Sequence, residues 1–182
     1  MRNQETWNSL VKQKALQIFS PRIQQDIETL PPSLELLYPL KSMYIYGKVG
    51  CGKTIYAAQL ILNLIKQDYL QGINRSVLFT TEPDMFMQIK KGFANEANEI
   101  IIDTYSQVDT LVIDDIGSKN PTDWVLEILY LIINARYEHL KTTIFTSNFD
   151  LKELANRYGD DRIGSRIERM GDCIFLKRDS NS

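Results

Sequence analysis

From residue 41 onward, short apolar runs alternate with longer segments in which apolar positions recur every three or four residues. The short runs are rich in β-branched residues and predict strands at residues 43–46, 77–81, 110–114, 142–147 and 173–177. The longer segments predict helices at residues 53–70, 98–106 and 124–140. Strands that alternate with helices are typical of parallel βαβ units, so the pattern indicates an α/β fold.

Two of these strands, at residues 110–114 and 142–147, read as apolar on both faces. A strand of this kind belongs to a parallel sheet with helices on both sides, because neither face can be left to water. The hydrophobic pattern therefore predicts a three-layer arrangement of helices, sheet and helices.

The first forty residues have a different pattern. Residues 6–19 predict a helix, and four prolines follow, at positions 21, 31, 32 and 39. We expect a helical arm and linker over residues 1–40 and one compact domain over residues 41–182, since 182 residues suffice for one proper core.

Composition excludes several classes of protein. The chain has 21 basic and 23 acidic residues, so no global positive field attracts nucleic acid, and any such contact has to be local. No apolar run is long enough to span a bilayer and the first residues lack a secretory signal, so we expect a soluble, cytoplasmic protein without a membrane partner. Cys51 and Cys173 have no partner at metal-ligand spacing, which predicts two free thiols.

The strongest motif lies between the first predicted strand and the long helix that follows it. It matches the phosphate-binding pattern G-x-x-x-x-G-K-[ST] in full, with Gly47, Lys48, Val49, Gly50, Cys51, Gly52, Lys53 and Thr54. Glycines let backbone N–H groups turn inward, and the helix N-terminus adds its dipole. We expect Lys53 to reach the β- and γ-phosphates of ATP and Thr54 to ligate Mg²⁺. A chance glycine-rich turn is the alternative, which the flanking strand and helix disfavour.

A second motif ends the predicted strand at residues 110–114, where Asp114 is followed by Asp115. It resembles a Walker B motif, in which Asp114 holds Mg²⁺ and Asp115 is the candidate base for a water that attacks the γ-phosphate. Many ATPases of this architecture have Glu at the second position. The alternative is an ordinary strand-end turn, Asp-Asp-Ile-Gly.

The strand at residues 142–147 is followed by Asn148, for which two roles are open. Asn148 can orient the attacking water if its strand lies between the other two. It can also cap a helix that starts near Asp150, and the residues alone favour this cap.

Near the C-terminus, Arg162, Arg166 and Arg169 fall on one face of a predicted helix, opposite Ile163 and Ile167. An arginine there can reach the γ-phosphate on a neighbouring subunit. A surface of ion pairs is the alternative, and the residues alone favour it.

Taken in order, these motifs resemble the ATPase domain of the bacterial replicative helicase loaders of the DnaC and DnaI type and of the IstB-like transposition helpers, a branch of the AAA+ ATPases. The strings that carry the resemblance are residues 44–54, 108–117, 146–148 and 159–167. It implies a P-loop NTPase fold of the AAA+ (ASCE) kind: a five-stranded parallel sheet with the strand before Asn148 between the two nucleotide-binding strands. Asn148 is then the sensor 1 residue.

The resemblance also implies a function. It predicts an ATPase that uses ATP and Mg²⁺, is slow and assembly-dependent, and loads or remodels a replicative helicase or another replication protein. Arg166 falls at the arginine-finger position, with Arg162 as the nearby alternative, and either acts in trans within a nucleotide-dependent homo-oligomer. In these loaders the segment between the Walker motifs touches single-stranded DNA. Here it holds Lys90, Lys91 and Phe93, and the alternative is a helix end with Phe93 in the core.

The chain departs from the family in two respects. No sensor 2 arginine string follows the last predicted strand, and there is no room for a helical lid, so we expect a minimal C-terminal lid or none. Three other functions stay open: a transposition helper, a nucleotide-gated adaptor with negligible catalysis, and a small-molecule kinase. The kinase fits poorly, because no arginine-rich lid appears after the second strand.

Overall fold

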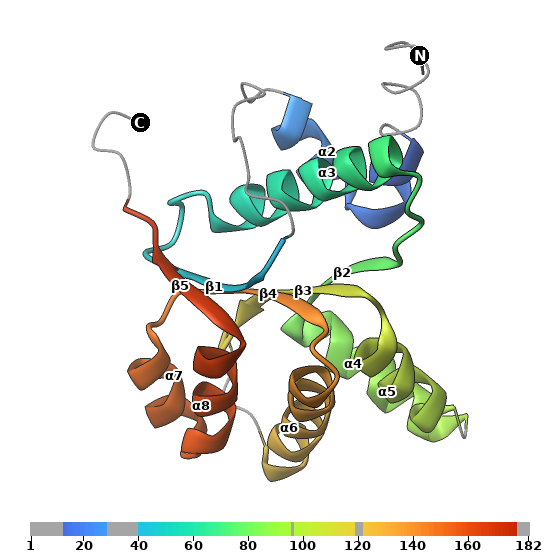
Figure 1. Ribbon diagram of the computed structural model, residues 1–182. Helices are drawn as coiled ribbons and strands as arrows, with labels where there is room; N and C mark the ends of the chain where they lie inside the picture. Colours follow the sequence, from blue (N-terminus) through green and yellow to red (C-terminus); the bar gives the residue numbers. More distant parts are fainter. Residues whose placement is uncertain (1–12, 29–39, 96, 119–121, 178–182) are drawn as a thin grey trace.

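The computed structural model describes residues 13–28, 40–95, 97–118 and 122–177, and its centre is one parallel sheet (Figure 1). The strands are β1 (Ser42–Tyr46), β2 (Val77–Thr81), β3 (Thr110–Ile116), β4 (Thr142–Ser147) and β5 (Gly171–Phe175). Their order in the sheet is β2-β3-β4-β1-β5, and every neighbouring pair is parallel. The five-stranded parallel sheet is thereby confirmed, although β5 begins two residues earlier than the predicted strand.

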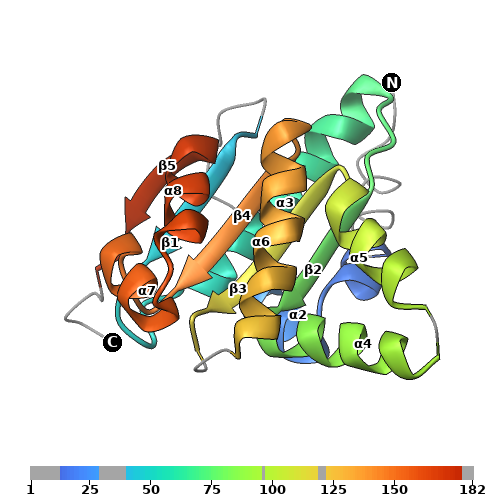
Figure 2. The same ribbon diagram turned by 90° about the horizontal axis from the view of Figure 1, so that it is seen from below.

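Helices cover both faces of this sheet, as Figures 1 and 2 show. They are α2 (Pro21–Glu28), α3 (Lys53–Gln71), α4 (Glu82–Ala94), α5 (Asn98–Gln107), α6 (Asp123–Glu138), α7 (Leu151–Tyr158) and α8 (Asp161–Met170). Helices α2 and α3 lie on one face and α4 to α8 lie on the other. None of these described helices has both the length and the apolar character that crossing a membrane requires.

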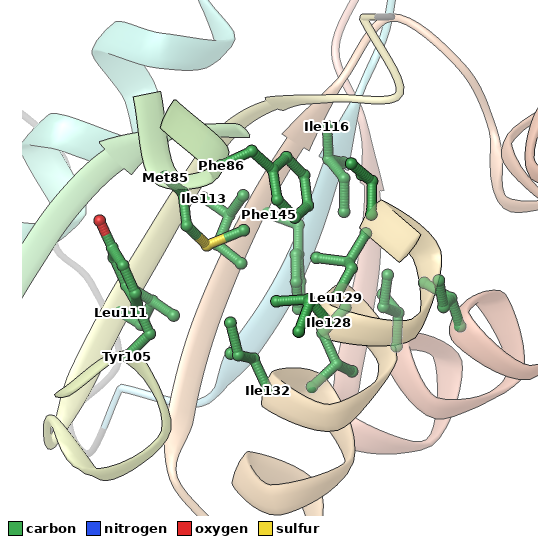
Figure 3. Packing of buried hydrophobic residues seen from close by; sticks show 14 of the residues in the cluster. Met85, Phe86, Tyr105, Leu111, Ile113, Ile116, Ile128, Leu129, Ile132 and Phe145 are labelled. Carbon is green, nitrogen blue, oxygen red and sulfur yellow. The ribbon is translucent and has the colours of Figure 1, made fainter. Parts of the chain in front are cut away.

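The core consists of two layers because successive residues of a strand point to opposite faces. In β3, Leu111 and Ile113 pack among α4 to α8, whereas Val112 packs under α3. Figure 3 shows the larger layer, in which Phe145 of β4 meets Leu129 of α6. All of these side chains are at most 1% exposed, which explains why the central strands are apolar on both faces.

The segment before the sheet differs from the prediction. Pro21 begins helix α2 instead of interrupting the chain, because the first position of a helix needs no N–H group. Phe19, just before it, is 4% exposed and packs edge-on against Phe79 of β2, with ring centroids 5.4 Å apart. Residues 13–18 are helical, and the rest of the helix predicted over 6–19 lies outside the described residues. The division of the chain at residue 40 stays a prediction.

A buried arginine stabilises the edge of the sheet where the strands begin. Arg136 of α6 is fully buried, and burial lowers the pKa of its guanidinium to about 10, so it stays charged at neutral pH. Its nitrogens donate hydrogen bonds of 2.7–3.3 Å to the Thr143 hydroxyl and to the carbonyl oxygens of Tyr105, Ser106, Val108 and Thr142. One side chain thereby joins the end of α5 to the start of β4.

Replacing Arg136 should destabilise the fold without changing the residues at the carboxyl ends of the strands. Arg136→Met keeps most of the aliphatic volume but leaves buried carbonyls without donors, so we expect the free energy of unfolding to fall by about 3 kcal/mol. Urea denaturation measures this loss, and Glu138→Ala, at an exposed position of the same helix, is the matched control. An unchanged midpoint for Arg136→Met would contradict the structural role.

Candidate functional site

The glycine-rich loop begins where β1 ends. The N–H of Gly47 donates to the Ser147 carbonyl (3.2 Å), which ties the loop to the end of β4. A Cβ at Gly47 would lie 2.3 Å from the Leu176 carbonyl oxygen, so a side chain does not fit there. Gly52, with φ 88°, turns the chain directly into α3, which starts at Lys53. The loop and the N-terminus of α3 therefore lie together, as phosphate binding requires.

Lys53 connects this loop to the neighbouring strand. Its side chain is buried, and the Nζ atom donates to the carbonyl oxygens of Gly47 (2.9 Å) and Lys48 (3.1 Å). The same Nζ donates to Asn148 Oδ1 at 2.9 Å, beyond the end of β4. A cation thus lies between the loop and the residue predicted to orient water.

Asp114 lies beside the loop, at the C-terminal part of β3, and is 7% exposed. Its carboxylate accepts hydrogen bonds from Thr54 Oγ1 (3.0 and 3.1 Å) and from Thr146 Oγ1 (2.5 Å). Burial raises the pKa of Asp114, and the two hydroxyl donors act in the opposite direction. Thr54 and Asp114 are therefore brought together as predicted.

These two residues suit a magnesium ion. Within the described part of the chain, no group of three or more His, Cys, Asp or Glu side chains is placed to hold a metal. Mg²⁺ needs no such cage, because it keeps several waters and takes one or two protein oxygens together with substrate phosphates. The hydroxyl of Thr54 and the carboxylate of Asp114 are oxygen ligands of this kind.

Asp115 has an uncommon backbone conformation for a residue with a side chain, with φ 58°. The register between β3 and β4 shifts between Ile113 and Ile116, so the chain bends there. The N–H of Asp115 donates to Thr146 Oγ1 (2.9 Å), and its Oδ1 accepts from Asn148 Nδ2 (2.9 Å). Asp and Asn tolerate left-handed backbone better than Glu does, which gives a physical reason for Asp at this position.

Asn148 does not cap a helix. The N-cap of α7 is Asp150, whose side chain accepts from the N–H of Glu153 (2.8 Å) in a complete capping box. The capping alternative is therefore wrong, because the amide of Asn148 bridges Lys53 and Asp115 instead. Strand β4 does lie between β1 and β3, as the family resemblance implied.

Sequence reasoning missed Thr146. Its hydroxyl donates to Asp114 and accepts from the N–H of Asp115, so one side chain fixes both acidic residues. Threonine is common in strands, and although Thr146 belongs to a string that carries the family resemblance, its residue type gives it no role different from that of Thr142 or Thr143.

The two candidate trans-acting arginines lie on α8 and pack toward α6. Arg162 forms an ion pair with Asp160 (2.7 Å) and stacks on Tyr130, with its guanidinium carbon 4.7 Å from the ring centroid. Arg166 Nε donates to Asn134 Oδ1 (2.9 Å), and its guanidinium carbon lies 4.8 Å from the centroid of Tyr137. Arg162 thus forms a surface ion pair, as one of the two alternatives predicted. The arginine-finger role of Arg166 or Arg162 stays a prediction.

The candidate DNA contacts lie on α4, with one further residue from α6. Lys90 Nζ is 5.9 Å from the ring centroid of Trp124, and the rings of Phe93 and Trp124 meet edge-on at 5.3 Å. Phe93 is 45% exposed, so its placement in the core is wrong, although it does lie at a helix end. We call Lys90, Lys91, Phe93 and Trp124 the α4 patch; Trp124 was not predicted, because it lies far from the others in sequence.

Comparison with known proteins finds a matching family model and several similar sequences. A family model described as "IstB-like ATP binding protein" matches residues 19–173. The replicative helicase loader DnaI of Bacillus subtilis is 27% identical over 129 residues, 70% of this chain. The replicative helicase loader DnaC of Escherichia coli is 29% identical over 139 residues, 75% of this chain.

A solved structure agrees with the fold. The crystal structure of the DnaC helicase loader superposes with a TM-score of 0.66 and 26% identity, and the match covers 86% of each chain. The chain spans only part of the curated relatives' own length, 40% for DnaI and 54% for DnaC.

Proposed function

The chain belongs to the IstB-like ATP-binding protein family, and we propose that it is an AAA+ ATPase that loads or remodels a replicative helicase. The observation that carries the ATPase proposal is the convergence of Lys53, Asp114 and Asn148 at the carboxyl ends of β1, β3 and β4. Ligands of open α/β sheets bind at this edge. The similarity to two helicase loaders supports the role in replication.

Each residue of the site has a role in this proposal. The backbone from Gly47 to Gly52 holds the phosphates, and Lys53 pairs with the β- and γ-phosphates. Thr54 and Asp114 hold Mg²⁺, which neutralises charge on the phosphates. Asp115 accepts a proton from the attacking water, and Asn148, whose amide lies between Lys53 and Asp115, orients that water.

Nucleotide turnover tests the enzyme directly. We expect Asp115→Asn to lower kcat by about 100-fold or more, because the base is lost. Asparagine tolerates the φ of 58° at this position, so ATP affinity should stay unchanged. Lys53→Ala should lose ATP binding altogether. Phosphate release and equilibrium binding of a fluorescent ATP analogue, each with and without single-stranded DNA, are the measurements.

The same assay tests the arginine of α8. We propose that Arg166, or else Arg162, reaches the γ-phosphate of a neighbouring subunit in a head-to-tail homo-oligomer. Arg166→Ala and Lys53→Ala should each be inactive alone, whereas their mixture should recover part of the activity at mixed interfaces. Wild-type protein that releases phosphate only at background in every condition would refute the ATPase proposal, and a mixture that stays inactive would refute trans action by Arg166.

The client protein is the second part of the proposal. We expect the wild-type chain to co-elute with the replicative helicase hexamer of its own organism in the presence of ATP and Mg²⁺, and Lys53→Ala to elute separately. Size-exclusion chromatography with light scattering measures the association. Asp115→Asn, which keeps the bound triphosphate, is the matched control and should co-elute. Separate elution of wild-type protein and helicase with ATP, ADP and no nucleotide would contradict the loader role.

We further propose that the α4 patch binds single-stranded DNA, because lysines beside the exposed ring of Phe93 and the half-buried ring of Trp124 suit both its phosphates and its bases. Phe93→Ala should weaken binding of a labelled oligonucleotide about tenfold, through loss of one stacked base. Fluorescence anisotropy at fixed salt measures the affinity. Phe175→Ala removes another phenylalanine that is about half exposed, on β5, and serves as the control. An equal loss of affinity in the two variants, or no loss in either, would exclude the α4 patch as a binding site for single-stranded DNA.

A further inference from the structure

The segment at the C-terminal end of β3 has an uncommon backbone conformation. We call Asp115, Ile116, Gly117 and Ser118 the β3 turn; its first and third residues have positive φ, 58° and 82°. A Cβ at Gly117 would lie 2.5 Å from Leu154 Cδ1, so α7 packs directly against the backbone there. Left-handed backbone at Asp115 persists only where the surroundings hold it, so the contacts of the turn need explanation.

The near end of the β3 turn is held by β4. Thr146 Oγ1 accepts from the N–H of Asp115 at 2.9 Å, and Ser147 Oγ donates to the carbonyl oxygen of Ile116 at 2.8 Å. Both hydroxyls belong to a buried strand at the centre of the sheet. This end of the turn therefore has a rigid support.

The far end is held by side chains from two helices. Glu82 Oε2 accepts from the N–H of Gly117 at 3.1 Å, and Arg157 Nε donates to the Gly117 carbonyl oxygen at 2.9 Å. Glu82 is the first residue of α4, and Arg157 belongs to the last turn of α7. Both backbone groups of Gly117 thus have a side-chain partner.

Glu82 is an unusual residue for a purely structural contact. It is 4% exposed, and its second oxygen accepts from the hydroxyl of Tyr158 (2.6 Å), which is 5% exposed. Burial raises the pKa of Glu82, since the charged form loses its water. A buried carboxyl group is costly, whereas glutamine or a hydrophobic residue would avoid that cost.

We propose that Glu82 and Tyr158 are positioning residues for ATP hydrolysis: by holding Gly117 they keep Asp115 in the left-handed conformation in which its carboxylate meets Asn148. This inference rests on the proposed ATPase function. Both residues act through the backbone of the β3 turn, since Tyr158 binds Glu82 and Glu82 binds the N–H of Gly117. Since Asp115 and Gly117 are two residues apart, a change of φ at one end displaces the carboxylate at the other.

The pair also connects the nucleotide site to two outer elements. Helix α4 starts at Glu82 and carries three of the four residues of the α4 patch, whereas α7 ends at Tyr158 and leads into α8 with Arg162 and Arg166. A displacement of α4 would therefore move Glu82, which binds the β3 turn, and a displacement of α7 would move Tyr158, which binds Glu82.

Four variants test the role. Glu82→Ala should lower kcat about tenfold or more, since small misplacements of a catalytic group are costly, while the Kd of the fluorescent ATP analogue stays within about threefold. Tyr158→Phe, which removes one oxygen, should lower kcat severalfold. Glu82→Gln should recover most of the activity, because its amide can accept from Gly117 and donate to the Tyr158 oxygen. Tyr105→Phe is the control, since the Tyr105 hydroxyl donates to Gln88 of α4 (2.9 Å) and does not touch the turn; its kcat should be unchanged.

The possible outcomes separate the two proposals. Wild-type turnover with unchanged kcat in Tyr158→Phe and in folded Glu82→Ala would overturn the role of the pair and leave the ATPase proposal intact. If Glu82→Ala does not fold, Tyr158→Phe and Glu82→Gln decide. Wild-type protein without turnover would refute the ATPase proposal and this inference together. An equal loss of kcat in Tyr105→Phe would show a general effect of packing around α4 and would also overturn the inference.

Discussion

Strand β4 lies between β1 and β3, and the candidate site depends on this placement. Parallel strands have their carboxyl ends on the same side of the sheet. The residues at the carboxyl end of β4 therefore lie between the phosphate loop, which follows β1, and the carboxylates of β3. The residues there are Thr146, which binds the carboxylate of Asp114 and the backbone N–H of Asp115, and Asn148, which bridges Lys53 and Asp115. If β4 lay on the outside of the sheet, the links through Thr146 and Asn148 would be lost, and only the hydrogen bond from Thr54 to Asp114 would join the two motifs.

Polar and charged groups inside the molecule are concentrated at the two ends of the strands. Lys53, Asp114 and Glu82 are buried at the carboxyl end, and Arg136 is buried at the other. Each has hydrogen-bond partners, which lowers the cost of removing it from water. Burial also fixes these groups in place. Fixed dipoles and charges need no reorganisation when charge develops on a phosphate, so the arrangement suits catalysis.

The parts that the sequence predicts are those encoded over a few neighbouring residues. The phosphate loop and Asp114 each follow from one motif, and the strand ranges follow from periodicity. The order of the strands did not follow from periodicity, and without the family resemblance Asn148 reads as a cap. Thr146, Trp124 and Glu82 escaped prediction because their partners lie 31 to 76 positions away or on another helix. Pro21 was misread because proline both interrupts helices and begins them.

The position of β1 between β4 and β5 affects how the sheet forms during synthesis of the chain. Residues 42–46 leave the ribosome long before residues 142–147 and 171–175, the two strands that flank them. Until then β1 can form no hydrogen bond with either neighbour, and its unpaired edges favour aggregation. A nascent chain that ends before β4 holds the complete phosphate loop but lacks the strand that supports it. We therefore expect the capacity to bind nucleotide to arise only after β4 has been made, about a hundred residues after the phosphate loop.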